Sequence, residues 1–171
     1  MFKDYFSAEN VMDWHLLLLI TQNGDGIKKN NYIYRKSSGQ PFLYIPWDFD
    51  HSFGREGDGE PMNDKLCDLT QHILFKRLIE INPNNYLQKL NARFLSLKKQ
   101  DILTVKNIFE LIDDNVKKLR PEIEANESRW PLNEVSYFKK SSFEMEVNRM
   151  KEWIENHLPK VEQHLNVLQK R

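Results

Sequence analysis

Two polar loops, at residues 23–30 and 48–54, constrain the fold more than any other feature of the chain. The first follows the apolar run 16–20, and its glycines Gly24 and Gly26 are expected to end a helix there. The second follows the apolar segment 42–47, which has the composition of a buried strand. This order predicts that the acidic and amide side chains of both loops gather at one end of a hairpin.

The first 64 residues are predicted to form one helix and one hairpin. Ser7 is a good N-cap with Glu9 in the first turn, so a helix should run from there to residue 20. Residues 31–35 and 42–45 are aromatic and β-branched, and they flank the turn-like segment 37–40. Residues 55–63 are polar and glycine-rich, which predicts an exposed loop.

The rest of the chain, residues 65–171, has the periodicity of a helical bundle. The expected helices cover residues 69–81, 85–98, 104–127 and 142–169. Thr104 is the expected cap of the third, and Ser141 with Glu144 forms a capping box for the fourth. Pro121 and Pro159 are expected to kink or divide their helices. The fold class is therefore mainly α with a small β-hairpin.

Length and charge place the chain among single-domain proteins without a nucleic-acid partner. Its 171 residues fit one domain, residues 1–171, or a large part of one. The 25 basic and 25 acidic residues balance, so no basic field favours nucleic acid. The single cysteine, Cys67, excludes an internal disulfide framework. No run is long and apolar enough for a transmembrane segment, and the first residues lack a signal-peptide pattern, so any export signal is expected upstream.

The acidic residues of the two loops have the order found in protein kinases. In that class of enzyme, a catalytic Asp is followed five positions later by a magnesium-binding Asn, and a second Asp follows a hydrophobic strand. Asp25 and Asn30 have this spacing, and Asp48 follows the second predicted strand. Each part occurs by chance in many chains, but the ordered set is more specific.

The same segments resemble the CotH family of atypical protein kinases. The resemblance rests on residues 23–34, with the pattern Asp…Asn-Asn-Tyr-x-Tyr, and on residues 46–54, with the pattern Pro-Trp-Asp-x-Asp…Phe-Gly. It implies the helical C-lobe of a kinase-like fold. It also implies that Asp25 is the catalytic residue, that Asn30 and Asp48 bind Mg²⁺ and ATP, and that Asp50 is a further metal ligand.

The resemblance implies transfer of the ATP γ-phosphate to a Ser hydroxyl of a protein substrate, a coat or cell-surface protein. The family also implies a spore-coat or extracytoplasmic location. No glycine-rich loop or strand Lys of a kinase N-lobe precedes Asp25, and Lys28 and Lys29 lie in the wrong segment to replace that Lys. The chain is therefore expected to be a C-terminal fragment or a degenerate homologue, inactive alone. His157 also departs from the Arg expected there.

Three other interpretations remain open at this stage. Residues 23–26 resemble part of a calcium loop, but Thr21 and Tyr32 occupy the positions that need acidic ligands. Asp25 and Asn30 can also simply build turns. Finally, the chain can be a noncatalytic assembly module whose helical tail, with Tyr137 and Phe138, forms the binding surface.

The residues next to the acidic positions are assigned structural roles. Trp47 and Phe49 alternate with Asp48, which favours packing over substrate contact. His51 and Ser52 are expected to shape the loop. Other histidines and Cys67 lack partner residues at useful spacings, so His15 is expected to be a buried polar group and Cys67 not to act as a nucleophile.

Overall fold

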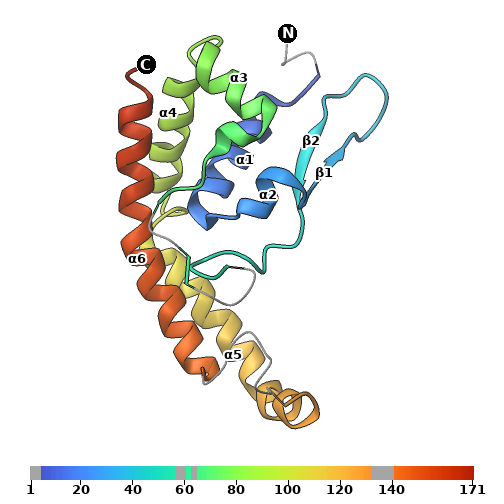
Figure 1. Cartoon of the computed structure of the whole chain (residues 1–171), viewed down its shortest axis with the longest axis vertical. Coiled ribbons are helices and arrows are strands. Elements are labelled where there is room, and N and C mark those ends of the chain that lie inside the picture. Colours follow the sequence, from blue (N-terminus) through green and yellow to red (C-terminus); the bar gives the residue numbers. More distant parts are fainter. Residues whose placement is uncertain (1–4, 57–60, 63–64, 132–140) are drawn as a thin grey trace.

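The computed structural model describes residues 5–56, 61–62, 65–131 and 141–171. It is mainly helical with one two-stranded antiparallel sheet, as predicted (Figure 1). The helices and strands are α1 Ala8–Thr21, α2 Gly24–Lys28, β1 Asn31–Tyr34, β2 Leu43–Pro46, the 3₁₀ turn η2 Leu69–Gln71, α3 Ile73–Ile81, α4 Tyr86–Lys99, α5 Val105–Arg129 and α6 Phe143–Leu168. None of the helices in these residues is both long and apolar enough to cross a membrane.

Helix α1 is the central element of the core. Ser7 caps its start, and its apolar residues are buried on nearly every side because α4, α6 and β2 all contact it (Figure 1). Phe75 from α3, Phe94 from α4 and Leu165 from α6 complete the same cluster. The core therefore joins the N-terminal segment to the C-terminal helices.

The hairpin is attached to α1 through Asn10 and Tyr44. The Asn10 side chain donates to the Tyr44 carbonyl at 3.2 Å and accepts from the Tyr44 amide at 2.7 Å. The Tyr44 ring is buried and stacks on Trp14, with 5.8 Å between ring centroids. The strands pair in the register Tyr32 with Ile45. These contacts hold the polar end of the hairpin beside the end of α1.

Two predictions about helix ends were wrong. Gly24 and Gly26 do not leave an open loop after the first helix; residues 24–28 form the short helix α2. The break comes two residues earlier, because Gln22 adopts a left-handed backbone with φ 55°. The capping box on Ser141 is also wrong, since the side chain of Ser142 accepts from the Met145 amide and caps α6.

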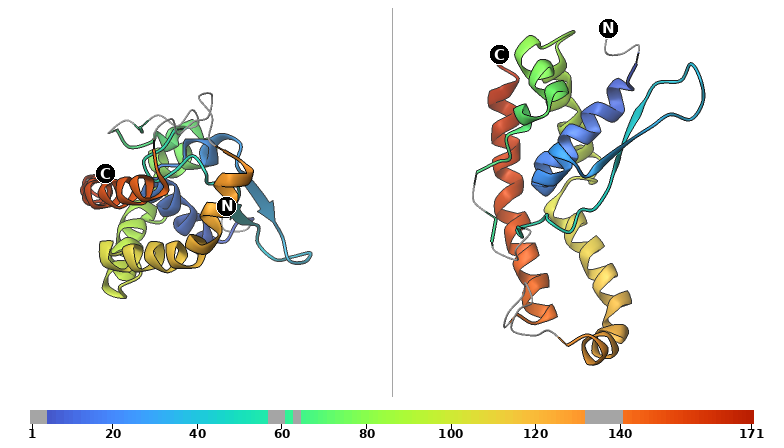
Figure 2. Two further views of the ribbon diagram at one scale, coloured as in Figure 1. Left: turned by 90° about the horizontal axis from the view of Figure 1, so that it is seen from below. Right: turned by 45° about the vertical axis from the view of Figure 1, so that its right-hand side comes forward.

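The two internal prolines do not divide their helices. Pro121 lies inside α5 and Pro159 inside α6, and both helices continue past them. The last turns of α5 nevertheless point away from the line of its first part, and the N-terminal half of α6 slants from the line of its C-terminal half (Figures 1 and 2). Because proline removes one helical hydrogen bond and crowds the preceding turn, a bend without a break is its usual outcome in a long helix.

Candidate functional site

Helix α2 fixes the position of Asp25 at the end of the hairpin. The buried side chain of Asn23 caps this helix by accepting from the Gly26 amide. The carbonyl of Asp25 accepts from the amides of Lys29 and Asn30, at 2.8 and 2.9 Å. Asp25 therefore lies in the first turn of a helix, where the unpaired amides favour a negative charge.

Asp48 lies at a corner where the two acidic loops meet. Its backbone has φ 56°, and its carbonyl accepts from the side-chain amides of Asn30 at 3.2 Å and Asn23 at 3.5 Å. Because Asn30 uses its Nδ2 atom in this bond, its Oδ1 atom is the one suited to a metal ion. The side chain of Asp48 is exposed. The structure thus brings the Asn30 side chain to the backbone of Asp48.

His51 connects the two remaining acidic residues. Its Nδ1 atom is 3.4 Å from Oδ2 of Asp25, and its Nε2 atom is 3.3 Å from Oδ2 of Asp50. Lys29 also approaches Asp25, at 3.1 Å. The sequence interpretation assigned His51 only a loop-shaping role. In the sequence, His51 is simply the neighbour of Asp50. That position does not reveal that the loop folds back and brings His51 to Asp25.

A polar cavity of about 430 Å³ opens on one side of Asp25. Asp25, His51 and Lys28 line it, together with Cys67 and Gln71 from the segment before α3. Asn30, Asp48 and Asp50 do not line it. Asp25 is therefore shared between this cavity and the corner formed by the two loops.

The cavity does not contain a reactive cysteine. Burial raises the pKa of the Cys67 thiol to about 12, and the thiol donates to the carbonyl of Leu18 at 3.5 Å. A thiol in this state is protonated at neutral pH and a poor nucleophile. This geometry agrees with the role expected from the sequence.

The donor set fits Mg²⁺ only if phosphate oxygens complete the coordination. Among the described residues, no three His, Cys, Asp or Glu side chains converge into a group able to hold a metal ion. Magnesium bound with a nucleotide, however, takes only one or two carboxylates from the protein and fills its other positions with phosphates and water. Asn30 and Asp48, whose loops meet at this corner, contain one amide oxygen and one carboxylate of the kind that such a site uses.

The acidic loop is anchored to α1 and α6 beyond Asp50. The Ser52 hydroxyl donates to the Phe49 carbonyl, and the Phe53 amide donates to the carbonyl of Thr21 at 3.0 Å. Arg55 forms two hydrogen bonds with Glu146 of α6, the Nε–Oε2 bond being 2.8 Å long. These contacts fix the path of the loop from both sides.

Trp47 departs from its predicted packing role. Phe49 packs edge-on against the core residue Trp14, as expected, but the Trp47 side chain is 56 % exposed. Its main contact is the edge of Tyr32, with 5.4 Å between the ring centroids. Tyr32 follows Asn30 by two residues and Trp47 precedes Asp48, so this exposed aromatic pair directly adjoins the corner.

Two histidines outside the site are buried structural groups. Nδ1 of His15 is 2.9 Å from the hydroxyl of Tyr86. The Nε2 atom of His157 donates to the carbonyl of Leu19 at 2.8 Å, and its ring stacks on Trp153. His157, which stands where the family resemblance implied an Arg, thus fixes α6 against the end of α1.

The fold and the site define a mainly helical domain in which two polar loops place acidic and amide side chains at one end of a hairpin. The chain belongs to the CotH kinase protein family, whose model matches residues 1–159. It is also 24 % identical over 165 residues to the inner spore coat protein H of Bacillus subtilis (strain 168). That match covers 96 % of this chain but only 43 % of the relative, so the chain spans less than half of that protein's length.

Proposed function

We propose that the chain is the metal- and acceptor-binding part of a CotH-type protein kinase, which transfers the γ-phosphate of ATP to a protein Ser hydroxyl. The observation that carries this proposal is the shared corner of the two loops, where the side chain of Asn30 holds the carbonyl of Asp48 at 3.2 Å. This bond is made by the backbone of Asp48, so it sets the two loops side by side and leaves the Asn30 Oδ1 atom and the Asp48 carboxylate for other partners. A nucleotide-metal site takes one or two carboxylates and amide oxygens from the protein, which these two loops contain.

Each acidic residue has a separate role in this proposal. Asn30 and Asp48 would hold Mg²⁺, with Asp50 as a further ligand, and the bound ion would neutralise charge on the β- and γ-phosphates. Asp25 orients the acceptor hydroxyl and accepts its proton from the side of the polar cavity. His51 holds the Asp25 carboxylate from the side facing Asp50.

The exposed aromatic pair is the candidate surface for the nucleotide base. Tyr32 in β1 follows Asn30 by two residues, and Trp47 lies between β2 and Asp48, so a base beside them leaves the phosphates near Asn30 and Asp48. Aromatic faces bind bases by stacking, which is worth about 1–3 kcal/mol per base in nucleic-acid complexes.

The proposed activity belongs to a longer protein. The chain covers 43 % of the relative's length, and the described residues provide no glycine-rich loop over the phosphates. We therefore expect this chain alone to transfer little phosphate. The relative is named as an inner spore coat protein, which favours a coat or cell-surface location and a protein acceptor there.

A noncatalytic assembly module is the second candidate function. The observation that favours it is a long apolar groove beside α5, which none of the described side chains fills. Tyr137 and Phe138, the aromatic residues expected to take part in such a surface, lie outside the described residues.

The deciding experiment measures binding of Mg²⁺ and ATP together by calorimetry and amide chemical shifts, in this chain and in the full-length protein. We expect Asp48→Asn to abolish saturable binding, whereas Asp114→Asn, on the exposed face of α5, should leave it unchanged. In the full-length protein, Asp48→Asn should also abolish magnesium-dependent autophosphorylation. Activity that survives Asp48→Asn would remove this residue from the metal site, and a full-length protein without any ATP binding would favour the assembly module.

A further inference from the structure

The end of the acidic loop lies along one face of α6. Arg55, directly after this loop, forms hydrogen bonds with Glu146. The Phe53 ring meets the Trp153 ring edge-on, with 6.2 Å between the ring centroids. Glu146 and Trp153 are seven residues apart in α6, so they share a helix face. The end of the loop therefore follows about two turns of this helix.

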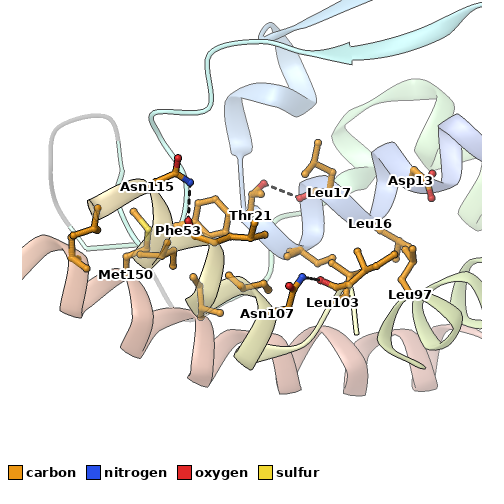
Figure 3. A pocket seen from close by; sticks show the side chains of 18 of the residues that line it. Asp13, Leu16, Leu17, Thr21, Phe53, Leu97, Leu103, Asn107, Asn115 and Met150 are labelled. Atoms are coloured by element: carbon orange, nitrogen blue, oxygen red, sulfur yellow. Dashed lines mark hydrogen bonds between the residues drawn. The ribbon is translucent and has the colours of Figure 1, made fainter. Parts of the chain in front are cut away.

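The same face of α6 is also joined to the end of α1. The Nε2 atom of His157 donates to the carbonyl of Leu19 at 2.8 Å, and the Phe53 amide donates to the carbonyl of Thr21 at 3.0 Å. The side chain of Phe53 lines the apolar groove beside α5 together with Thr21 and Met150 (Figure 3). The loop is thus held between two helices that are themselves bonded to each other.

The carboxylate of Glu146 is the group on which the polar contacts converge. Arg55 forms two hydrogen bonds with it, the Nε–Oε2 bond being 2.8 Å long, and the Ser141 hydroxyl donates to it as well. Arg149, three residues further along α6, approaches it at 3.3 Å. The side chains of Arg55 and Glu146 are only 14 % and 24 % exposed. A two-bond contact between Arg and a carboxylate fixes geometry as well as charge.

The Arg55–Glu146 pair lies outside the hydrophobic core. The first buried residue of α6 is Ile154, about two turns beyond Glu146. The pair instead borders a cavity of about 270 Å³ that Asp50 also lines. Its effect therefore falls on the position of the acidic loop more than on the packing of the core.

We propose that Arg55 and Glu146 are a positioning pair for the metal-binding loop. Helix α6 is the fixed support, and the pair determines where the loop places Asp48 and Asp50. This inference rests on the proposed function and adds to it two residues that touch neither the metal ion nor the nucleotide. A displacement of about 1 Å, caused by a remote substitution, can slow an enzyme about 100-fold. Loss of the pair should therefore weaken the site without unfolding the protein.

Removal of either charge in the full-length protein tests the proposal. Arg55→Met or Glu146→Gln should raise the dissociation constant for Mg²⁺ in the presence of ATP about tenfold or more, and slow autophosphorylation. Excess Mg²⁺ should recover most of this rate, whereas it should not rescue Asp48→Asn, which loses a proposed ligand. The double variant should lose no more than the weaker single variant, because both substitutions break the same contact.

The Arg93–Asp13 pair provides a matched control. It is also a two-bond contact between Arg and a carboxylate, at 2.8 and 3.0 Å, but it joins α4 to α1 outside both loops. Arg93→Met and Asp13→Asn should leave the binding of Mg²⁺ and ATP unchanged. Urea unfolding of all variants identifies conditions in which each is folded. A loss of binding in these controls that equals the loss in Arg55→Met would assign both pairs to general stability and overturn the proposal.

Amide hydrogen exchange separates this inference from the proposed function. The Phe53 amide, which is bonded to Thr21, should exchange faster in Arg55→Met than in the wild-type protein, with or without ligand. Unchanged Mg²⁺ and ATP binding in both Arg55→Met and Glu146→Gln would overturn this inference alone. A full-length wild-type protein that binds neither ligand would overturn the proposed function, and with it the role of the pair in metal binding.

Discussion

At the scale of single residues, the candidate site depends on backbone groups as much as on carboxylates. The carbonyl of Asp48 accepts hydrogen bonds from the side chains of both Asn30 and Asn23, and Asn23 also caps the helix that carries Asp25. One buried asparagine therefore links the catalytic candidate to the metal candidate. Its replacement would disturb both at once, which is why the binding test uses the carboxylate of Asp48 instead.

Trp47 gives a residue-scale prediction about nucleotide binding. If its exposed ring stacks on the base, Trp47→Ala in the full-length protein should weaken ATP binding by about 1–3 kcal/mol. Trp47→Phe keeps an aromatic face, so its ATP binding should weaken much less. Calorimetry with ATP and with inorganic triphosphate, both with Mg²⁺, measures this. A loss that is equal for the two ligands would assign Trp47 to the fold rather than to the base.

His15 predicts a specific sensitivity of the fold to acid. Burial, with a smaller contribution from His164, lowers the pKa of His15 from 6.5 to about 3. Between pH 3 and pH 6.5, His15 therefore binds a proton in the unfolded chain but not in the folded chain. The free energy of unfolding should therefore fall as the pH drops below about 6.5, by up to about 1.4 kcal/mol per pH unit from this group.

Urea unfolding between pH 7.5 and 4.5 would measure that slope. The variant His15→Gln removes the titrating group and should flatten the dependence. Some slope should remain, because burial also lowers the pKa of His72 and of His164. Equal slopes in wild type and His15→Gln would mean that His15 is not the group that titrates.

Spacing in the sequence identified the acidic residues but not the contacts among them. Asp25, Asn30 and Asp48 can be picked out by their spacing along the sequence, and the structure places the Asn30 side chain beside Asp48. The roles of Asn23 and His51 depend on the left-handed turn at Asp48, which brings the second loop back over the first. Asp adopts such a backbone state more often than most residues but still rarely, so its presence alone does not predict the turn.

At the scale of elements, the acidic loop is held against α6 by a close backbone approach. Gly54 has φ 96°, and a Cβ atom there would lie 2.8 Å from Cγ of Trp153. Gly54→Ala should therefore destabilise the fold by at least about 2 kcal/mol, from backbone strain and from the steric clash.

Gly39 in the hairpin turn is the matched control for this change. It also has positive φ, 84°, but no other group lies within 4 Å of the position that an alanine methyl would take there. Gly39→Ala should lower the free energy of unfolding through backbone strain alone, by about 1 kcal/mol. Denaturant unfolding of both variants gives the difference. If the two costs are equal, the contact between Gly54 and Trp153 contributes nothing beyond conformation.

The periodicity of the sequence predicted which segments are helices, but the positions of the helix ends depend on contacts with neighbouring elements. The sequence placed all the long helices correctly but missed α2, because Gly24 and Gly26 have low helix propensity. The cap from Asn23 and the bond from Asn31 to the Gly26 carbonyl stabilise this turn. Ser142 rather than Ser141 caps α6, while Ser141 bonds to Glu146.

At the scale of the whole molecule, stability and exposed apolar surface lie in different regions. The core joins α1, α3, α4 and the C-terminal half of α6, while α5 and the first turns of α6 contribute no buried residue (Figure 1). The sequence could not reveal this division, because the apolar stripes of α5 and α6 have the same period. Which stripe is covered depends on the chain path, not on local pattern.

This division predicts different losses of stability for Leu165→Ala and Leu119→Ala, although both leucines belong to apolar helix stripes. Leu165 in α6 is fully packed, so Leu165→Ala should lower the free energy of unfolding by about 2–5 kcal/mol at every protein concentration. Leu119 is largely exposed in one chain, so Leu119→Ala should cost no more than about 0.5 kcal/mol in dilute solution. Urea unfolding of both variants measures the two costs. A large cost for Leu119→Ala would mean that α5 is packed within one chain.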